Sequence, residues 1–254
     1  SLLYMLDDKR SFFALASHGF SPPTFAETLT PEGQINPEIA PETGWNYELG
    51  FKGNIFGQLF ANVSVYSMQI SNLLVAERVG EDQFVGKNAG KTANNGLELN
   101  LNYVGQLKSI QITPFANYTF AAYKFVDFVD DGNDYSGNQL TGVPKHQFNV
   151  GTFVTSNLGF YGNAVYNFVG EMPMRDDNSK YSESYGVLNF KLGWQKSIKK
   201  FNLNIYAGIN NVLNENYASM ILVNAPAFGA NAPRYFYPGL PINYYTGLRL
   251  GYNF

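Results

Sequence analysis

Apolar and polar residues alternate along segment after segment of this 254-residue chain. In the last segment, aromatic and aliphatic residues such as Leu248 and Leu250 take every second position, and Gly247, Arg249 and Gly251 lie between them. Successive side chains of a strand point to opposite faces, so the pattern predicts strands with one apolar and one polar face. No helical spacing of apolar residues persists for two turns, so no helix is predicted.

The connections between these segments are alternately short and long. Short turns are predicted at residues 7–9, 53–57, 104–108, 156–159 and 197–200. Longer connections are predicted at residues 19–41, 77–88, 126–139, 171–184 and 214–242. About ten full strands and one stub result, joined as an antiparallel meander. Short turns on one rim and long loops on the other are typical of an outer-membrane barrel, with its turns in the periplasm and its loops outside.

The composition favours a protein that lies in a membrane and argues against a soluble domain. Charged residues make up 15% of the chain and aromatic residues 16%, whereas a soluble surface usually carries about 25–35% charged residues. The mean hydropathy is −0.19, and the sequence has no apolar run of the roughly 20 residues that a transmembrane helix needs. We therefore predict an all-β fold, an antiparallel up-and-down transmembrane β-barrel in contact with the lipid bilayer.

Charge and cysteine content exclude some partners. The net charge of −3 provides no basic face for nucleic acid, so no nucleic-acid partner is expected. The chain contains no cysteine, which excludes disulfides and cysteine-based metal sites. It starts at Ser1 without a methionine or a signal peptide, and we expect it to be part of a longer protein.

Six segments of the chain resemble the C-terminal half of the barrel of TonB-dependent outer-membrane receptors, in both order and spacing. They are SFFALASHGFSPPTFAET from Ser11, NPEIAPETGWNYELGFKG, NAGKTANNGLELNLNY, TGVPKHQFNVG, AGINNVLNENYAS and GLRLGYNF, which ends at Phe254. Each motif is weak alone, but together they span almost the whole chain. The paired Asn210 and Asn211 in the fifth segment fit a strand leaving the membrane or an Asx-rich turn.

The resemblance implies a receptor of the siderophore type. Such barrels have about 22 strands and a plugged lumen, so residues 1–254 would be the C-terminal part of the barrel, without the plug domain and first strands. The whole protein would take up a scarce nutrient, most simply a ferric siderophore, across the bacterial outer membrane. TonB and its inner-membrane energising complex would be partners through the absent N-terminal region. No resident cofactor is expected, because iron would arrive within the chelated substrate.

The end of the chain resembles the signal that the outer-membrane barrel assembly machinery recognises. Its residues would be Leu248, Leu250, Tyr252 and Phe254. A well-packed last strand is the simpler explanation. In the same way, Trp45 and Tyr47 are expected to point outward near the upper membrane interface, where amphipathic rings are favoured.

Two of the long loops combine aromatic residues with cations. The candidate ligand-binding residues are Arg175, Arg234, Tyr235, Phe236 and Tyr237, near Met172, Met174, Pro226 and Phe228. Aromatic faces and guanidinium groups suit a flat anionic chelate through stacking, cation–π contacts and bidentate hydrogen bonds. Alternatively, these rings pack loop against loop or form an aromatic girdle.

No catalytic set emerges, so the protein is not expected to be an enzyme. His18 and His146 lack metal-site spacing, and each is expected to have a structural role or a role at the barrel rim. The carboxylate pairs 7–8, 130–131 and 176–177 are expected to be solvated loop tips. Two alternatives stay open, a ten-stranded barrel protease or phospholipase that would join Asp176 or Ser179 to His18, and a porin-like structural or adhesive barrel.

Five charged residues on the predicted lumen face require partners. They are expected to form inward ion-pair ladders or to contact the plug, and they are Glu48, Lys52, Glu98, Lys191 and Arg249.

Overall fold

A computed structural model describes the chain except for residues 31, 81–82, 89, 131 and 228–231. The described residues form β-strands and irregular connections without an α-helix. No candidate helix for crossing a membrane is therefore found among them.

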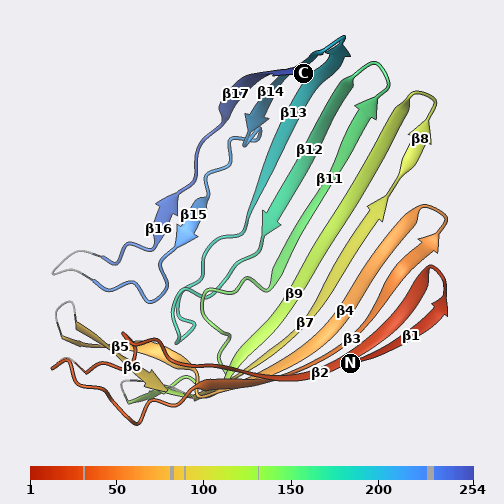
Figure 1. Cartoon of the computed structure of the whole chain (residues 1–254). Coiled ribbons are helices and arrows are strands. Elements are labelled where there is room, and N and C mark those ends of the chain that lie inside the picture. Colours follow the sequence, from red (N-terminus) through yellow and green to blue (C-terminus); the bar gives the residue numbers. More distant parts are fainter. Residues whose placement is uncertain (31, 81–82, 89, 131, 228–231) are drawn as a thin grey trace.

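The main feature is one antiparallel 13-stranded sheet that curves as an open wall (Figure 1). Eleven of its described strands follow one another in chain order from β1 at one edge to β17 at the other. They are β1 (Leu2–Asp7), β2 (Arg10–Ser21), β3 (Glu42–Phe56), β4 (Leu59–Ser71), β7 (Gly90–Tyr103), β9 (Ile110–Asp130), β11 (His146–Ser156), β12 (Phe160–Val169), β13 (Tyr185–Ile198), β14 (Phe201–Asn210) and β17 (Asn243–Tyr252). The predicted stub and ten full strands are confirmed.

Six shorter strands belong to the connections. β8 (Gly105–Leu107) and β10 (Asn133–Asp134) each pair with β9. β5 (Leu74–Gly80) pairs with β6 (Gln83–Asn88), and β15 (Ala218–Ile221) pairs with β16 (Phe236–Pro238). The prediction of a plain loop at residues 77–88 was therefore wrong, because β5 and β6 form a hairpin there. The sequence of this segment is polar and charged and shows no clear alternation, so it did not indicate strands.

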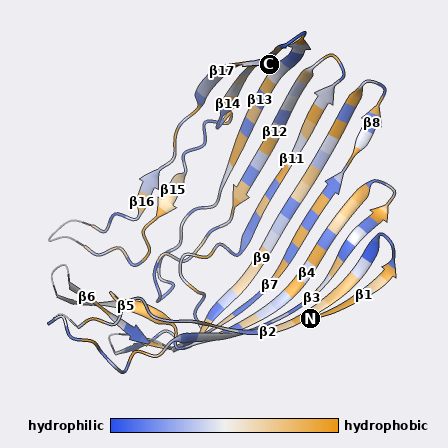
Figure 2. Ribbon diagram, viewed as in Figure 1, coloured by the Kyte–Doolittle hydropathy of each residue, from blue (hydrophilic) through white to orange (hydrophobic). Residues whose placement is uncertain are grey.

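One face of the sheet is apolar and exposed. Along β17, Leu248 and Leu250 expose 63% and 69% of their surface, and they pair with Ile205 and Leu203 of β14. The outward row continues through Trp194 of β13 to Phe160 of β12. Figure 2 shows the corresponding alternation of hydrophobic and hydrophilic residues along these strands. Exposed aliphatic and aromatic rows of this kind suit acyl chains as their solvent.

The opposite face is polar and carries a row of asparagines across neighbouring strands. The Asn117 amide donates to Asn149 at 2.7 Å and accepts from Asn100. Register places Asn62 beside Asn100 and Asn167 beside Asn149, so the row extends over five strands. Amide side chains both donate and accept, which lets Asn100, Asn117 and Asn149 hydrogen-bond in series on the lumen-facing wall.

Tyrosine rings cover glycines on the same inner face. Tyr206 covers Gly247, where an added Cβ would lie 2.2 Å from the ring, and Tyr161 covers Gly193 in the same way at 2.3 Å. The missing side chain gives each ring space to lie flat against the neighbouring strand. The rings and the asparagine row together make the inner face a structured polar surface.

Candidate ligand site in the long loops

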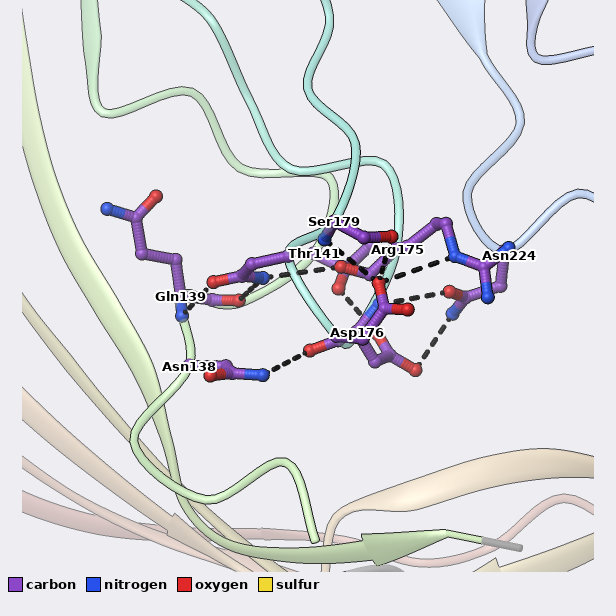
Figure 3. Close-up of polar contacts among 9 residues, drawn as sticks. Asn138, Gln139, Thr141, Arg175, Asp176, Ser179 and Asn224 are labelled. Atoms are coloured by element: carbon purple, nitrogen blue, oxygen red, sulfur yellow. Dashed lines mark hydrogen bonds and ion pairs between the residues drawn. The ribbon is translucent and has the colours of Figure 1, made fainter. Parts of the chain in front are cut away.

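Asp176 connects three long loops that are far apart in sequence (Figure 3). Its carboxylate accepts hydrogen bonds from the Thr141 hydroxyl at 2.5 Å and from the Asn224 amide at 2.9 Å. Its backbone carbonyl accepts from the Asn138 amide at 2.8 Å. Residues 138 and 141 lie in the connection between β9 and β11, Asp176 lies between β12 and β13, and Asn224 lies between β14 and β17. The expectation of a solvated loop tip is therefore wrong for Asp176.

Asn178 strengthens the first of these connections. Its side chain accepts from the backbone N–H of Gln139 at 2.7 Å and donates to the Gln139 carbonyl at 3.0 Å. The residue has a φ of +52°, a left-handed conformation that asparagine adopts more readily than most residues. The two bonds pair the Asn178 amide with the backbone of Gln139, as two strands pair in a sheet. They fix the loop after β12 against the loop after β9.

An apolar cluster lies beneath the polar contacts. Met174 is fully buried, and Tyr235 and Ala225 expose 3% and 5% of their surface. The Lys180 ammonium lies 4.6 Å from the centre of the Tyr235 ring. Tyr235 and Met174 therefore pack loop against loop, which was the alternative to ligand contact for these rings.

Arg175 is the cation at the rim of this cluster. Its Nε lies 3.3 Å from the Asp177 carboxylate, and both side chains are partly exposed. Hydrogen bonds from Ser179, at 2.6 Å from its hydroxyl, are the main cause that lowers the pKa of Asp177, with a smaller contribution from Arg175. The Arg175 guanidinium thus has an anionic partner within its own loop, and a hydrogen bond with Tyr235 is the main cause that raises the pKa of Arg175.

The other candidate ligand residues lie along the hairpin of β15 and β16. Phe236 and Tyr237 expose 52% and 51% of their surface, and Arg234 is also exposed. Pro226 precedes residues 228–231, and Phe228 lies outside the described residues. The structure thus separates the candidates into a buried packing residue, Tyr235, and four exposed residues. Their role in ligand binding stays a prediction.

Sequence reasoning missed the structural role of Asn211. This side chain is 1% exposed, accepts from the Glu215 backbone N–H at 2.8 Å and donates to the Glu215 and Leu240 carbonyls. It therefore closes both ends of the connection between β14 and β17. The Asx-rich turn that the sequence allowed is the arrangement found, and the Asn210–Asn211 pair was its signal.

The histidines lie among outward-facing rings near the long-loop rim. The His18 ring is 4.9 Å from that of Trp45, and Nδ1 of His146 is 2.9 Å from the Tyr118 hydroxyl. Neither contacts Asp176 or Ser179, so the pairing that a barrel hydrolase would require is not formed. Within the described residues, no group of three or more His, Cys, Asp or Glu side chains is arranged to hold a metal.

The remaining carboxylate pairs bind nearby cations or lie outside the described residues. Asp7 forms an ion pair with Arg10 at 2.5 Å. Asp130 lies 3.7 Å from Lys87, and Asp131 is not among the described residues. Asp7 and Asp8 are exposed, as expected for a solvated turn, and the ion pairs add a cation partner for Asp7 and for Asp130.

The lumen-facing charges do not form the expected ion-pair ladder in the described part of the chain. Lys191 instead places its ammonium 4.3 Å from the centre of the Tyr206 ring. Cation–π contacts of this kind hold a charge where carboxylates are absent. Plug contact, the other expectation for Glu48, Lys52, Glu98 and Arg249, stays a prediction.

The outward positions of the predicted interface and terminal residues follow the register. Trp45 and Tyr47 are each 49% exposed, and their rings stack with centroids 6.0 Å apart. Leu248, Leu250 and Tyr252 share the outward face of β17, and the Phe254 ring contacts that of Tyr252 at 5.3 Å. Recognition by an assembly machinery stays a prediction.

An antiparallel meander with an apolar outside, a polar inside, short turns and long interlocked loops defines the class of outer-membrane β-barrels. Within that class, residues 1–212 match the family described as "TonB dependent receptor-like, beta-barrel", so the chain belongs to this family. Its members are receptors and transporters of the outer membrane of Gram-negative bacteria.

Relatives and solved structures agree with this assignment. The chain is 32% identical over 181 residues to an uncharacterized TonB-dependent receptor of Haemophilus influenzae, covering 65% of this chain and 48% of the relative. It is 24% identical over 227 residues to the vitamin B12 transporter BtuB of Vibrio vulnificus, covering 88% and 33%. The fold matches the siderophore receptor PiuA from Acinetobacter baumannii with a TM-score of 0.72 at 18% identity, covering 98% of this chain and 34% of that one. The chain thus spans about half or less of the length of these proteins.

Proposed function

We propose that the protein carrying these residues captures a bulky nutrient, first of all a ferric siderophore, and transports it across the outer membrane with energy delivered by TonB. The observation that carries the proposal is the unit formed by the loops after β9, β12 and β14, which Asp176 and Asn178 fasten together. Fixed loops present side chains in one geometry, which lowers the conformational cost of binding.

The exposed residues at this unit have the chemistry of the proposed ligand. Phe236 and Tyr237 offer aromatic faces, and Arg175 and Arg234 offer guanidinium groups. A ferric chelate is bulky, often flat and anionic, so stacking and bidentate hydrogen bonds would act together. Iron would be cargo inside the chelate, and no bond would be made or broken by the protein.

The names of the matched proteins support the same class of activity. They include a siderophore receptor and a vitamin B12 transporter. TonB, its inner-membrane energising complex and the barrel assembly machinery are proposed partners on the same basis.

Uptake of labelled ligands by a strain in which this receptor is the sole route for iron would test the proposal. Labelled ferric siderophores, haem and cobalamin would be offered to cells with the receptor, without it and with TonB deleted. Uptake of a ferric siderophore that requires both the receptor and TonB supports the proposal. Uptake that is indifferent to TonB would remove the transport mechanism, and uptake of cobalamin alone would replace the substrate.

A further inference from the structure

The outward face of the wall contains an apolar hollow of about 830 Å³ between β11 and β17. Small residues form much of its base, among them Gly162 and Ala164 on β12 and Ala207 on β14, and the side chain of Leu192 on β13 lies against Gly162. Register places these three small residues on the same face as Leu248, and therefore on the lipid side. Where neighbouring parts of this face are filled by bulky side chains, this part is recessed.

Large side chains form the walls of the hollow. Phe160 and Trp194 pair across β12 and β13 at the end near the short turns, and Phe190 stands at the other end. The Trp194 indole donates to the Leu158 carbonyl at 3.1 Å, which fixes this wall against the turn between β11 and β12. An extended apolar chain lying along the strands would fit between the two ends.

Positive charge is concentrated at the short-turn end of the hollow. Lys196 follows Trp194 on the outward face of β13, where it pairs with Leu203. Lys199 and Lys200 form the adjoining turn, and the Lys200 ammonium lies 5.7 Å from the Tyr252 ring on the outward side of β17. Residues 193–203 and 154–161 contain no Asp or Glu, so these lysines have no carboxylate in either adjoining turn.

We propose that this hollow is a phospholipid site, which takes one acyl chain of an anionic glycerophospholipid while Lys196 and the adjoining turn hold its phosphate. Apolar walls alone would accept any acyl chain, and the lysines select a lipid with a net negative headgroup. The short turns belong to the periplasmic rim, so the lipid comes from the inner leaflet, and lipid A of the opposite leaflet is not the ligand. The site is independent of the nutrient that the loops bind.

Native mass spectrometry of the intact receptor tests this assignment. The protein would be purified in detergent and offered mixed micelles containing phosphatidylglycerol, phosphatidylcholine or lipid A. Retention of one phosphatidylglycerol per receptor is expected, in preference to the other two lipids. Lys196→Gln should lower phosphatidylglycerol retention about fivefold and leave phosphatidylcholine retention unchanged, as expected for the loss of one lysine at a lipid headgroup.

Filling the hollow tests the acyl-chain half of the site. Ala164→Leu with Ala207→Leu should lower phosphatidylglycerol retention at least tenfold, whereas Ala116→Leu, on the outward face of β9 but outside the hollow, should not. Lys91→Gln, near the long-loop end of β7, is the control for charge. Heat-modifiable migration would confirm folding, and Thr246→Leu replaces the double variant if that variant does not fold. Equal retention of phosphatidylglycerol and phosphatidylcholine, preference for lipid A or unchanged retention by the filled variant would overturn the proposal.

Discussion

The carboxylate of Asp176 accepts a hydrogen bond from the Thr141 hydroxyl at 2.5 Å across 35 positions of sequence. The same carboxylate reaches Asn224 across a further 48 positions. One side chain thus holds three loops that emerge from different parts of the wall. Loss of its bonds should loosen all three loops at once, and this sets it apart from its neighbour Asp177, whose partners Arg175 and Ser179 lie in its own loop.

Asp176→Ala should loosen the loops at Thr141 and Asn224, while the bonds of Asn138 to the Asp176 carbonyl and of Asn178 to Gln139 persist. Hydrogen bonds to charged groups contribute about 1.5–3 kcal/mol each, so hydrogen exchange around Thr141 and Asn224 should accelerate by about tenfold or more. Asp177→Ala is the matched control and should affect only its own loop. Equal, local effects from both variants would show that Asp176 does not connect the loops.

Alanine variants of Tyr235 and Tyr237 should show that the first ring contributes to loop packing and the second to ligand binding. Tyr235→Ala removes a ring that is 3% exposed from the cluster with Met174, which should lower local stability by about 3 kcal/mol. Tyr237→Ala removes a ring that is 51% exposed and should leave loop protection unchanged while weakening siderophore binding.

Hydrogen exchange and a binding titration on the same two proteins would check both statements. Tyr235→Phe keeps the ring and should retain most of the stability. A Tyr237→Ala variant that binds every tested ferric siderophore as well as the native protein would remove this residue from the ligand site.

The loop after β12 should keep its stability at mildly acidic pH and loosen only below about pH 4. The pKa of Asp177 is lowered in the folded loop, chiefly by Ser179, so its contribution to loop stability is present above the unfolded pKa of about 3.9. That contribution is lost as the pH falls through the folded pKa. Limited proteolysis between pH 7 and pH 5 should therefore show no change in this loop, and cleavage should rise below about pH 4. Ser179→Ala should reduce the rise in cleavage at low pH, because the folded pKa of Asp177 then returns toward its unfolded value, and an unchanged pH dependence in this variant would contradict the cause.

Gly159 should tolerate a side chain far less well than Gly57, although both lie in short turns with positive φ. A Cβ on Gly159 would lie 2.1 Å from the Gln195 carbonyl oxygen, whereas a Cβ on Gly57 meets nothing within 4 Å. Gly57→Ala should cost only the left-handed conformation, about 1–2 kcal/mol, and Gly159→Ala should cost clearly more. Urea unfolding of both variants in lipid vesicles checks the order, and equal midpoints would contradict it.

The sequence predicted the wall better than the loops, for a physical reason. A strand exposes its two faces at every second residue, so Leu203 and Ile205 were separable from Asn202 and Asn204 without coordinates. The hairpin of β5 and β6 was not predicted, because residues 77–88 show no such alternation.

The contacts of the candidate site depend on which loops meet in space, which the spacing of residues does not reveal. Asp176 looked like an ordinary acidic loop tip because its partners, Thr141 and Asn224, belong to other loops. Tyr235 looked equivalent to Phe236 and Tyr237, and only the position of Met174 makes it a packing residue. The fold distinguishes the packing residue from the exposed ones, and the role of the exposed residues in ligand binding stays a prediction.

The membrane wall itself can be tested by site-directed spin labelling of β14 in the intact receptor, of which residues 1–254 contain no cysteine. Labels at positions 203 and 205 should be accessible to oxygen dissolved in the bilayer, and labels at positions 202 and 204 should be shielded from it. A two-residue period in lipid accessibility is the result that the account requires. The same accessibility at all four positions, or lipid contact at 202 and 204, would contradict it.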